Sequence, residues 1–148
     1  LNQPHDEITS IFVKSDYKLV QIELDNILYV EGLKDYVKIY EEGNQRPILS
    51  LMSMKAMEEL LPASRFMRVH RSYIVQKSKI RIIDRGRIIF GKTSIPVSES
   101  YKAAFQEYLD RRSWSAHTIN FLAIHTWYSE NKSYICGQIE QWSCETLQ

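Results

Sequence analysis

The sequence predicts a mostly β domain with about ten short strands and two short helices, and three of its features lead to this prediction. Apolar and polar residues alternate over short segments between Ile11 and Val97, which is the pattern of half-buried strands. Glycine, asparagine and aspartate separate these segments and suit turns. Only two stretches, residues 54–61 and 101–109, repeat apolar residues at helical spacing.

The first third of the chain contains five strand candidates. They lie at residues 11–13, 17–24, 27–31, 36–40 and 46–51. The fourth alternates most clearly, and we expect Val37 and Ile39 to face the core while their neighbours face solvent. We expect Gly32 to open a break between the third and fourth strands.

Two helices and five more strands are expected in the next part of the chain. The first helix should follow Ser53, an N-capping residue, and bury a stripe formed by Met54, Met57, Leu60 and Leu61. The second should follow Ser98 and end near Arg112, burying Tyr101, Ala104, Phe105, Tyr108 and Leu109. Between them, strands are expected at residues 66–69, 72–75, 79–83, 87–90 and 93–97.

The length and composition favour one folded domain with an appendage, since 44% of the 148 residues are hydrophobic and 25% are charged. We expect a linker or frayed N-terminus at residues 1–10, the β domain at residues 11–112, and a C-terminal tail of unknown role at residues 113–148. The start at Leu1 suggests a fragment of a longer protein. No apolar run reaches the ~18 residues of a membrane span, and the two cysteines match no zinc or redox spacing, which favours a cytoplasmic chain.

Basic residues are concentrated in one segment although the net charge is only +1. Residues 62–92 contain nine lysines and arginines and one acid, Asp84, a local balance of 9 − 1 = +8. Such a block attracts a polyanion, although a set of solvated strand and loop positions would give the same count.

The sequence lacks the motifs of common enzyme classes. Phosphate-binding glycine loops, the G-x-S-x-G nucleophile motif and H-E-x-x-H are all absent, and the four histidines are too scattered to indicate a metal site. We therefore expect a protein that is not an enzyme and needs neither cofactor nor metal.

The stretch FMRVHRSYIVQ, residues 66–76, contains the clearest candidate site. Its strand-like alternation slips at His70 and Arg71, because a regular strand that buries Met67, Val69, Tyr73 and Val75 would also bury Arg71. A loop that leaves the strand there would expose both polar side chains while core residues hold its ends. Arginine can bond to guanine O6 and N7 in the major groove, and histidine can donate or accept there.

This stretch, with IPVSESYKAAF about twenty residues later, resembles the LytTR family of bacterial DNA-binding domains. The upstream segments KSDYKLVQI and ILYVEGLKDYVKIY resemble the family's opening strands and first conserved block. The resemblance covers roughly residues 8–112 and leaves the tail outside.

The resemblance implies an elongated arrangement of short antiparallel sheets whose loops enter successive major grooves of double-stranded DNA. It implies a transcriptional regulator: the output domain of a two-component response regulator, preceded by a receiver domain and binding direct repeats in promoters. A homodimer on the DNA is left open.

By the same resemblance, the base contacts would come from Lys34, Asp35, His70, Arg71 and Ser98. The phosphate contacts would come from Lys14, Ser15, Arg68, Ser100 and Lys102. Asp35 would either accept from a cytosine amino group or orient Lys34. The family often has an arginine where this chain has Glu99, an acid that would face phosphate, so Ser98 could instead be only an N-cap.

Two other functions remain open from the sequence. A β-rich protein-interaction or ligand-sensing module could use the basic segment as a face for an acidic partner. A single-stranded RNA binder could stack bases on surface Tyr36 and Tyr40.

Overall fold

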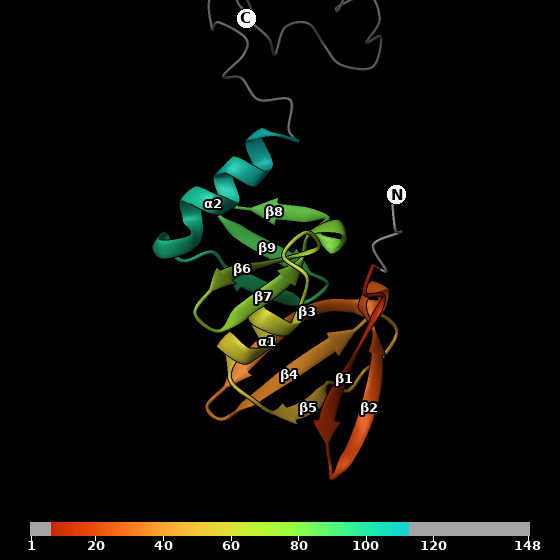
Figure 1. The fold of residues 1–148 in the computed structure, drawn as a ribbon. Coiled ribbons are helices and arrows are strands. Elements are labelled where there is room, and N and C mark those ends of the chain that lie inside the picture. Colours follow the sequence, from red (N-terminus) through yellow and green to blue (C-terminus); the bar gives the residue numbers. More distant parts are fainter. Residues whose placement is uncertain (1–6, 113–148) are drawn as a thin grey trace, which may run out of the picture. The chain divides into compact units, whose positions relative to one another are not determined.

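In the computed structural model, residues 7–112 are described and form ten strands, two α-helices and two short 3-10 helices (Figure 1). The strands are β1 (Ser10–Ser15), β2 (Lys18–Glu23), β3 (Ile27–Leu33), β4 (Tyr36–Glu41), β5 (Ile48–Leu51), β6 (Phe66–His70), β7 (Tyr73–Gln76), β8 (Ile82–Asp84), β9 (Arg87–Phe90) and β10 (Thr93–Pro96). The helices are η1 (Leu24–Asn26), α1 (Met54–Leu60), η2 (Lys77–Lys79) and α2 (Glu99–Asp110). The prediction of a mostly β domain with two helices is confirmed for this part of the chain.

Backbone contacts divide the chain into two units, Leu1–Glu107 and Tyr108–Gln148. All ten strands of the described residues belong to the first unit. Of the second unit only residues 108–112 are described, and they include the last residues of α2. No helix within residues 7–112 is long and apolar enough to cross a membrane.

The strands of the first unit form three antiparallel sheets, with the orders β1-β2, β10-β9-β8 and β5-β4-β3-β7-β6. In the largest sheet, β3 pairs with both β4 and β7. Because both pairings are antiparallel, the end of β3 lies beside the start of β4 and the start of β7. The β3–β4 turn and the β6–β7 turn therefore lie at the same end of this sheet (Figure 1).

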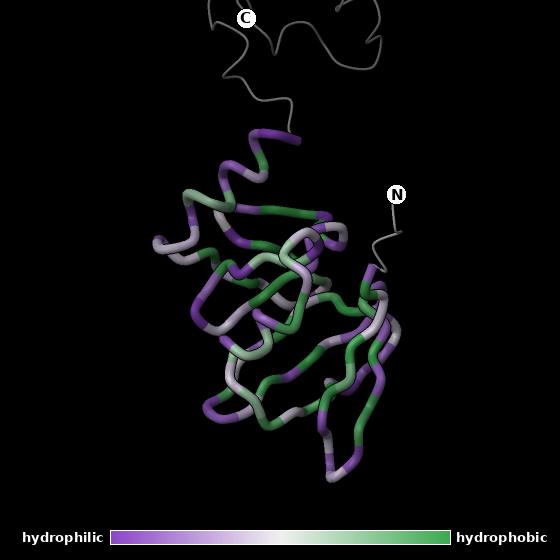
Figure 2. Tube along the Cα trace, viewed as in Figure 1, coloured by the Kyte–Doolittle hydropathy of each residue, from purple (hydrophilic) through white to green (hydrophobic). Residues whose placement is uncertain are grey.

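One face of the five-stranded sheet carries the main core, which the β1-β2 hairpin and α1 cover. The core consists of Ile11, Val13, Ile22, Leu24, Ile27, Val30, Val37, Ile39, Met57, Leu61, Phe66 and Ile74. Figure 2 shows hydrophobic residues alternating with hydrophilic ones along these strands, and connecting turns that are mostly hydrophilic. Val37 and Ile39 face the core as the alternation predicted.

The opposite face of the same sheet is built from tyrosines and one carboxylate. Tyr29 and Tyr40 stack with ring centroids 4.4 Å apart, and Tyr29 also meets Phe90 of β9 at 5.1 Å. The Glu31 carboxylate accepts from the hydroxyls of Tyr40 at 2.9 Å and Tyr73 at 3.1 Å. Both faces of the central strands are thus covered, which is why Val75, on this side, is as buried as Ile74 on the other.

The first helix has the predicted cap, and each helix differs from the prediction at one position of its buried stripe. The Ser53 side chain accepts from the Ala56 N–H at 3.1 Å and caps α1, as predicted. Leu60, expected in the buried stripe of α1, is 37% exposed, and Ala104 of α2 is exposed. Both lie at the margin of a stripe whose centre, at Met57 or Phe105, is buried.

Gly32 does not open a break, contrary to the prediction, because it lies inside β3. The break is the two-residue turn at Lys34 and Asp35, where Lys34 takes a left-handed φ of 53°. Gly32 is needed for the close approach of α1 to β3, because a Cβ at this position would lie 2.6 Å from Cγ of Met54 in α1.

The predicted strand at residues 79–83 is also wrong in its bounds. The chain forms a 3-10 helix at Lys77–Lys79, and the strand that follows, β8, is shorter than predicted.

We expect Gly32→Ala to lower the free energy of unfolding by about 1–3 kcal/mol, because the added methyl overpacks the contact with Met54. In a Met54→Ala background the same change should cost little, since the methyl then has room. Denaturant unfolding of the four proteins of this double-mutant cycle measures the coupling. Equal costs in the two backgrounds would contradict this packing argument.

Candidate nucleic-acid interface

The β6–β7 hairpin contains the slip that the sequence indicated. The pairing register shifts between Arg68, opposite Ile74, and His70, opposite Tyr73, so Val69 is an extra residue in the strand. Arg71 and Ser72 then form a two-residue turn. Arg71 is exposed and His70 is half-buried, so neither side chain is sealed from water.

The buried residues of this hairpin differ from the predicted set. Val69 and Val75 are buried as expected, but Met67 and Tyr73 are only half-buried, and Phe66 and Ile74 take places in the main core. The register still puts Met67, Tyr73 and Val75 on one face, so the prediction was wrong about how deeply Met67 and Tyr73 are buried and not about the face they share.

The His70 ring is held by its own turn. Its Nδ1 accepts a hydrogen bond from the Ser72 N–H at 3.1 Å, and the ring lies 5.7 Å from that of Tyr73. A neutral imidazole that accepts at Nδ1 carries its proton on Nε2. His70 therefore has Nε2–H as its donor for an external partner.

The Tyr73 side chain is in turn held by its hydrogen bond to the Glu31 carboxylate. Burial and donation to this carboxylate raise the pKa of the Tyr73 hydroxyl, and the same causes raise the pKa of Tyr40. Both hydroxyls therefore remain donors over the physiological pH range. The Glu31 carboxylate thus links β3, to which it belongs, with β4 and β7.

The turn that contains Lys34 and Asp35 and the turn that contains Arg71 are joined through the backbone. The Gly32 N–H donates to the Ser72 carbonyl at 2.8 Å, which connects the end of β3 to the β6–β7 turn. Lys34 and Asp35, in the turn that follows β3, are both exposed. Figure 2 shows the two turns as hydrophilic loops at one side of the sheet.

Ser98, the remaining predicted base contact, is bonded to the same β6–β7 hairpin. The Ser98 N–H donates to the carbonyl of the bulged Val69 at 2.9 Å, and Ser98 lies directly before α2. Ser100 and Lys102 are exposed. The Lys102 ammonium lies 3.2 Å from the Glu99 carboxylate, so this acid has a base beside it.

Lys14 and Ser15 lie near the tip of the β1-β2 hairpin. The turn between these strands has two left-handed residues, Asp16 at φ 47° and Tyr17 at φ 64°, as two-residue hairpin turns favour. The buried Ser50 hydroxyl donates to the Lys14 carbonyl at 2.8 Å and ties this hairpin to β5. The Lys14 side chain remains exposed.

The Arg68 guanidinium is engaged by the protein itself. It forms an ion pair with Glu58 of α1 at 2.8 Å and donates to the carbonyls of His70 at 3.3 Å and Arg71 at 2.7 Å. Its side chain is only 17% exposed. Sequence reasoning placed Arg68 among the phosphate contacts and missed these bonds, although its alternation with Phe66 puts it on the core-facing side, where an arginine needs partners.

The other basic residues of the segment 62–92 are not all available to a polyanion. Arg65 pairs with Asp25, and Lys79 pairs with Glu42 at 2.6 Å. With the Arg68–Glu58 pair, three of the nine bases meet acids from outside the segment. The local balance counted along the sequence therefore overstates the charge of this surface.

The surface tyrosines expected for RNA stacking are not equivalent. Tyr36 is 49% exposed, but Tyr40 is half-buried, stacked on Tyr29 and bonded to Glu31. Only Tyr36 presents a ring to solvent as that alternative requires.

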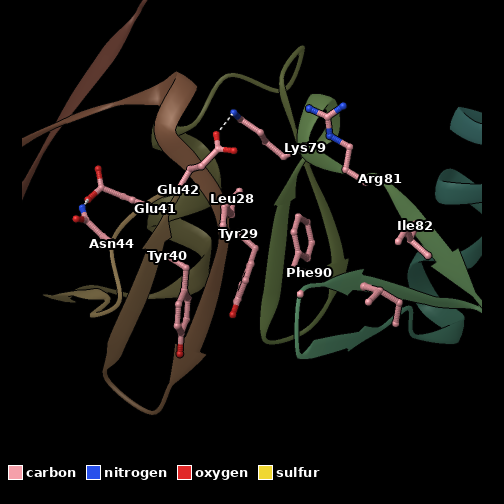
Figure 3. Close-up of a pocket in the computed structure, with 12 residues that line it drawn as sticks. Leu28, Tyr29, Tyr40, Glu41, Glu42, Asn44, Lys79, Arg81, Ile82 and Phe90 are labelled. Carbon is pink, nitrogen blue, oxygen red and sulfur yellow. Dashed lines mark hydrogen bonds and ion pairs between the residues drawn. The ribbon is translucent and has the colours of Figure 1, made fainter.

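A pocket of about 360 Å³ lies near the other end of the β3–β4 hairpin (Figure 3). Tyr29, Tyr40 and Phe90 line it, and the Glu42–Lys79 ion pair lies at its rim. None of the predicted DNA-contacting residues lines this pocket, so the predicted site and the pocket are separate.

Comparisons with known proteins agree on one family. The family model of the LytTR DNA-binding domain matches residues 17–110, which is more than half of the chain. Among solved structures, the LytTR DNA-binding domain of a protein described as a methyl-accepting/DNA response regulator from Bacillus cereus is similar, with a TM-score of 0.56 and 23% identity. The match covers 68% of this chain and 96% of that one.

We expect nitrogen NMR of the uncomplexed domain to place the proton of neutral His70 on Nε2, because Nδ1 accepts from Ser72. The histidines outside residues 7–112 provide internal reference signals. A neutral His70 protonated on Nδ1 would contradict this hydrogen bond.

Proposed function

This chain belongs to the LytTR family of DNA-binding domains, and on that premise we propose that it reads a specific double-stranded sequence with its β3–β4 and β6–β7 turns and the start of α2. The observation that carries the proposal is the pair of backbone hydrogen bonds, Gly32 to Ser72 and Ser98 to Val69, that link these three regions. The proposed readers are Lys34, Asp35, His70, Arg71 and Ser98.

The turns have the size and chemistry for the major groove. A groove about 12 Å wide admits a two-stranded ribbon, and each of these turns has only two residues. Arg71 would donate to O6 and N7 of a guanine. His70, with its donor at Nε2, would select an acceptor, such as purine N7 or thymine O4, and not an amino group.

The β3–β4 turn would read a base pair close to the one that the β6–β7 turn reads, because the Gly32–Ser72 hydrogen bond holds the two turns side by side and one helical turn of DNA spans about 34 Å. Lys34 would donate to a purine acceptor there, while Asp35 would accept from a cytosine amino group or orient Lys34. The exposure of both side chains supports this assignment.

Phosphate contacts would flank the base-reading turns. Lys14, Ser15, Ser100 and Lys102 are candidates, since Lys14, Ser100 and Lys102 are exposed and Ser15 lies beside the hairpin tip. Each neutralised phosphate releases counterions, so affinity should fall with rising salt by about 0.9 log units per phosphate for each tenfold increase in salt. Lys102 remains a candidate phosphate contact although it pairs with Glu99, because an exposed ion pair of this kind is weak and a DNA phosphate can replace the carboxylate.

We further propose that the domain is the output module of a two-component response regulator, with a receiver domain N-terminal to it. The similar Bacillus cereus domain, which is described as part of a response regulator, supports this proposal. Direct repeats in promoters and a cytoplasmic location would follow from that role. Selection of bound fragments from random duplex DNA, followed by competition with single strands, tests the proposed reading of a duplex sequence. Equal binding of single strands would overturn that proposal.

Arg71→Ala should weaken binding to the selected duplex by about 1–3 kcal/mol, because a bidentate guanine contact is lost. Binding to random duplex should fall no more than it does for Arg85→Ala, which removes the same charge from a side chain that is 92% exposed in the β8–β9 turn. Titrations of both variants on both duplexes give the comparison. Equal losses on selected and random DNA would make Arg71 a backbone contact.

Lys34→Ala should relax the preference at one base pair close to the position that His70 reads, because the two turns lie side by side. Repeating the fragment selection with this variant measures the preference at each position of the site. An unchanged selected sequence would remove Lys34 from the set of base readers.

A further inference from the structure

We propose that Arg68 is a positioning residue that fixes the β6–β7 turn for base reading, and that it does not act by neutralising a phosphate. This inference rests on the proposed DNA-reading function and replaces the role that the sequence suggested for this residue. Base reading by His70 and Arg71 would then depend on the Arg68 side chain.

The guanidinium binds the two residues that would read the bases through their own carbonyls. One nitrogen, Nε, donates to the His70 carbonyl at 3.3 Å, and Nη2 donates to the Arg71 carbonyl at 2.7 Å. The planar guanidinium can address two carbonyls on successive residues, whereas a lysine ammonium is a single point of donation. The backbone of the turn is therefore tied to one rigid group.

Two further contacts fix the guanidinium itself. Nη1 pairs with the Glu58 carboxylate of α1 at 2.8 Å, and the guanidinium carbon lies 5.8 Å from the centre of the Tyr101 ring of α2. α1, the β6–β7 turn and α2 thus all contact one side chain. With 17% of that side chain exposed, little of its charge is presented to an external phosphate.

The other side of the hairpin is held by different bonds. Gly32 donates to the Ser72 carbonyl, and Ser98 donates to the Val69 carbonyl. Together with Arg68, these bonds engage the carbonyls of four successive residues, Val69 to Ser72. Loss of Arg68 would release the middle two, which belong to the readers.

The experiment compares Arg68→Lys and Glu58→Gln with Lys79→Ala as the matched control. Lys79 belongs to the same basic segment, is 20% exposed and pairs with Glu42, but it lies at the rim of the pocket away from the turns. Each variant is titrated with the selected duplex and with random duplex over a range of salt. Two quantities are measured: the ratio of the two affinities and the salt slope.

Arg68→Lys keeps the charge, so it should lower the affinity ratio by about tenfold or more, the scale of a lost base contact, with an unchanged salt slope. Glu58→Gln should lower the ratio less, and Lys79→Ala should leave it unchanged. Arg68→Gln, which removes the charge, should also leave the slope unchanged. A slope that falls by about 0.9 in Arg68→Gln, with a preserved ratio in Arg68→Lys, would make Arg68 a phosphate contact and overturn the proposal.

Amide hydrogen exchange without DNA gives an independent test. In Arg68→Lys or, should that variant not fold, in Glu58→Gln, the Gly32 amide should exchange faster, because its acceptor lies in the released turn. The Leu24 amide, bonded to the Thr9 carbonyl, serves as the control. Unchanged exchange of the Gly32 amide in both variants would contradict the positioning role of Arg68. The exchange test does not depend on DNA binding. A wild-type domain without sequence preference would therefore refute the proposed function and leave the exchange result valid.

Discussion

The antiparallel pairing of β3 with both β4 and β7 is the constraint on which the candidate interface depends. It brings two turns that are more than thirty residues apart in the sequence to one end of one sheet, and the Gly32–Ser72 hydrogen bond joins them there. The absent side chain of Gly32 also lets α1 approach, and α1 supplies the carboxylate that holds Arg68. Gly32 therefore takes part both in the link between the two turns and in the packing of α1 against the sheet.

Much of the local structure could be predicted from the sequence because it depends on neighbouring residues. The Ser53 cap, the inward Val37 and Ile39, and the slip before Arg71 are all local patterns. The burial of Ile74 and Val75 together could not be read from alternation, since a strand covered on both faces loses its period of two.

The partners of the basic segment show a second limit of sequence reasoning. Charge counted along the chain gave a local excess of bases, but folding brings Asp25, Glu42 and Glu58 from other elements to three of them. A count along the sequence therefore cannot separate arginines that hold the protein together from arginines that face solvent. For the candidate site, the sequence predicted the turn at His70 and Arg71 but not the hydrogen bonds by which the Arg68 guanidinium holds it.

The bulge at Val69 explains how one short strand can hold a residue that fixes the turn and a residue that would read a base. In a regular strand Arg68 and His70 would lie on the same face, two residues apart. The extra residue instead places Arg68 opposite Ile74, on the face that α1 covers, and His70 opposite Tyr73, on the other face. The residue that holds the turn and the residue that would read the base are thereby directed to opposite sides of the sheet. Because this separation comes from the backbone register, it does not depend on the DNA being present.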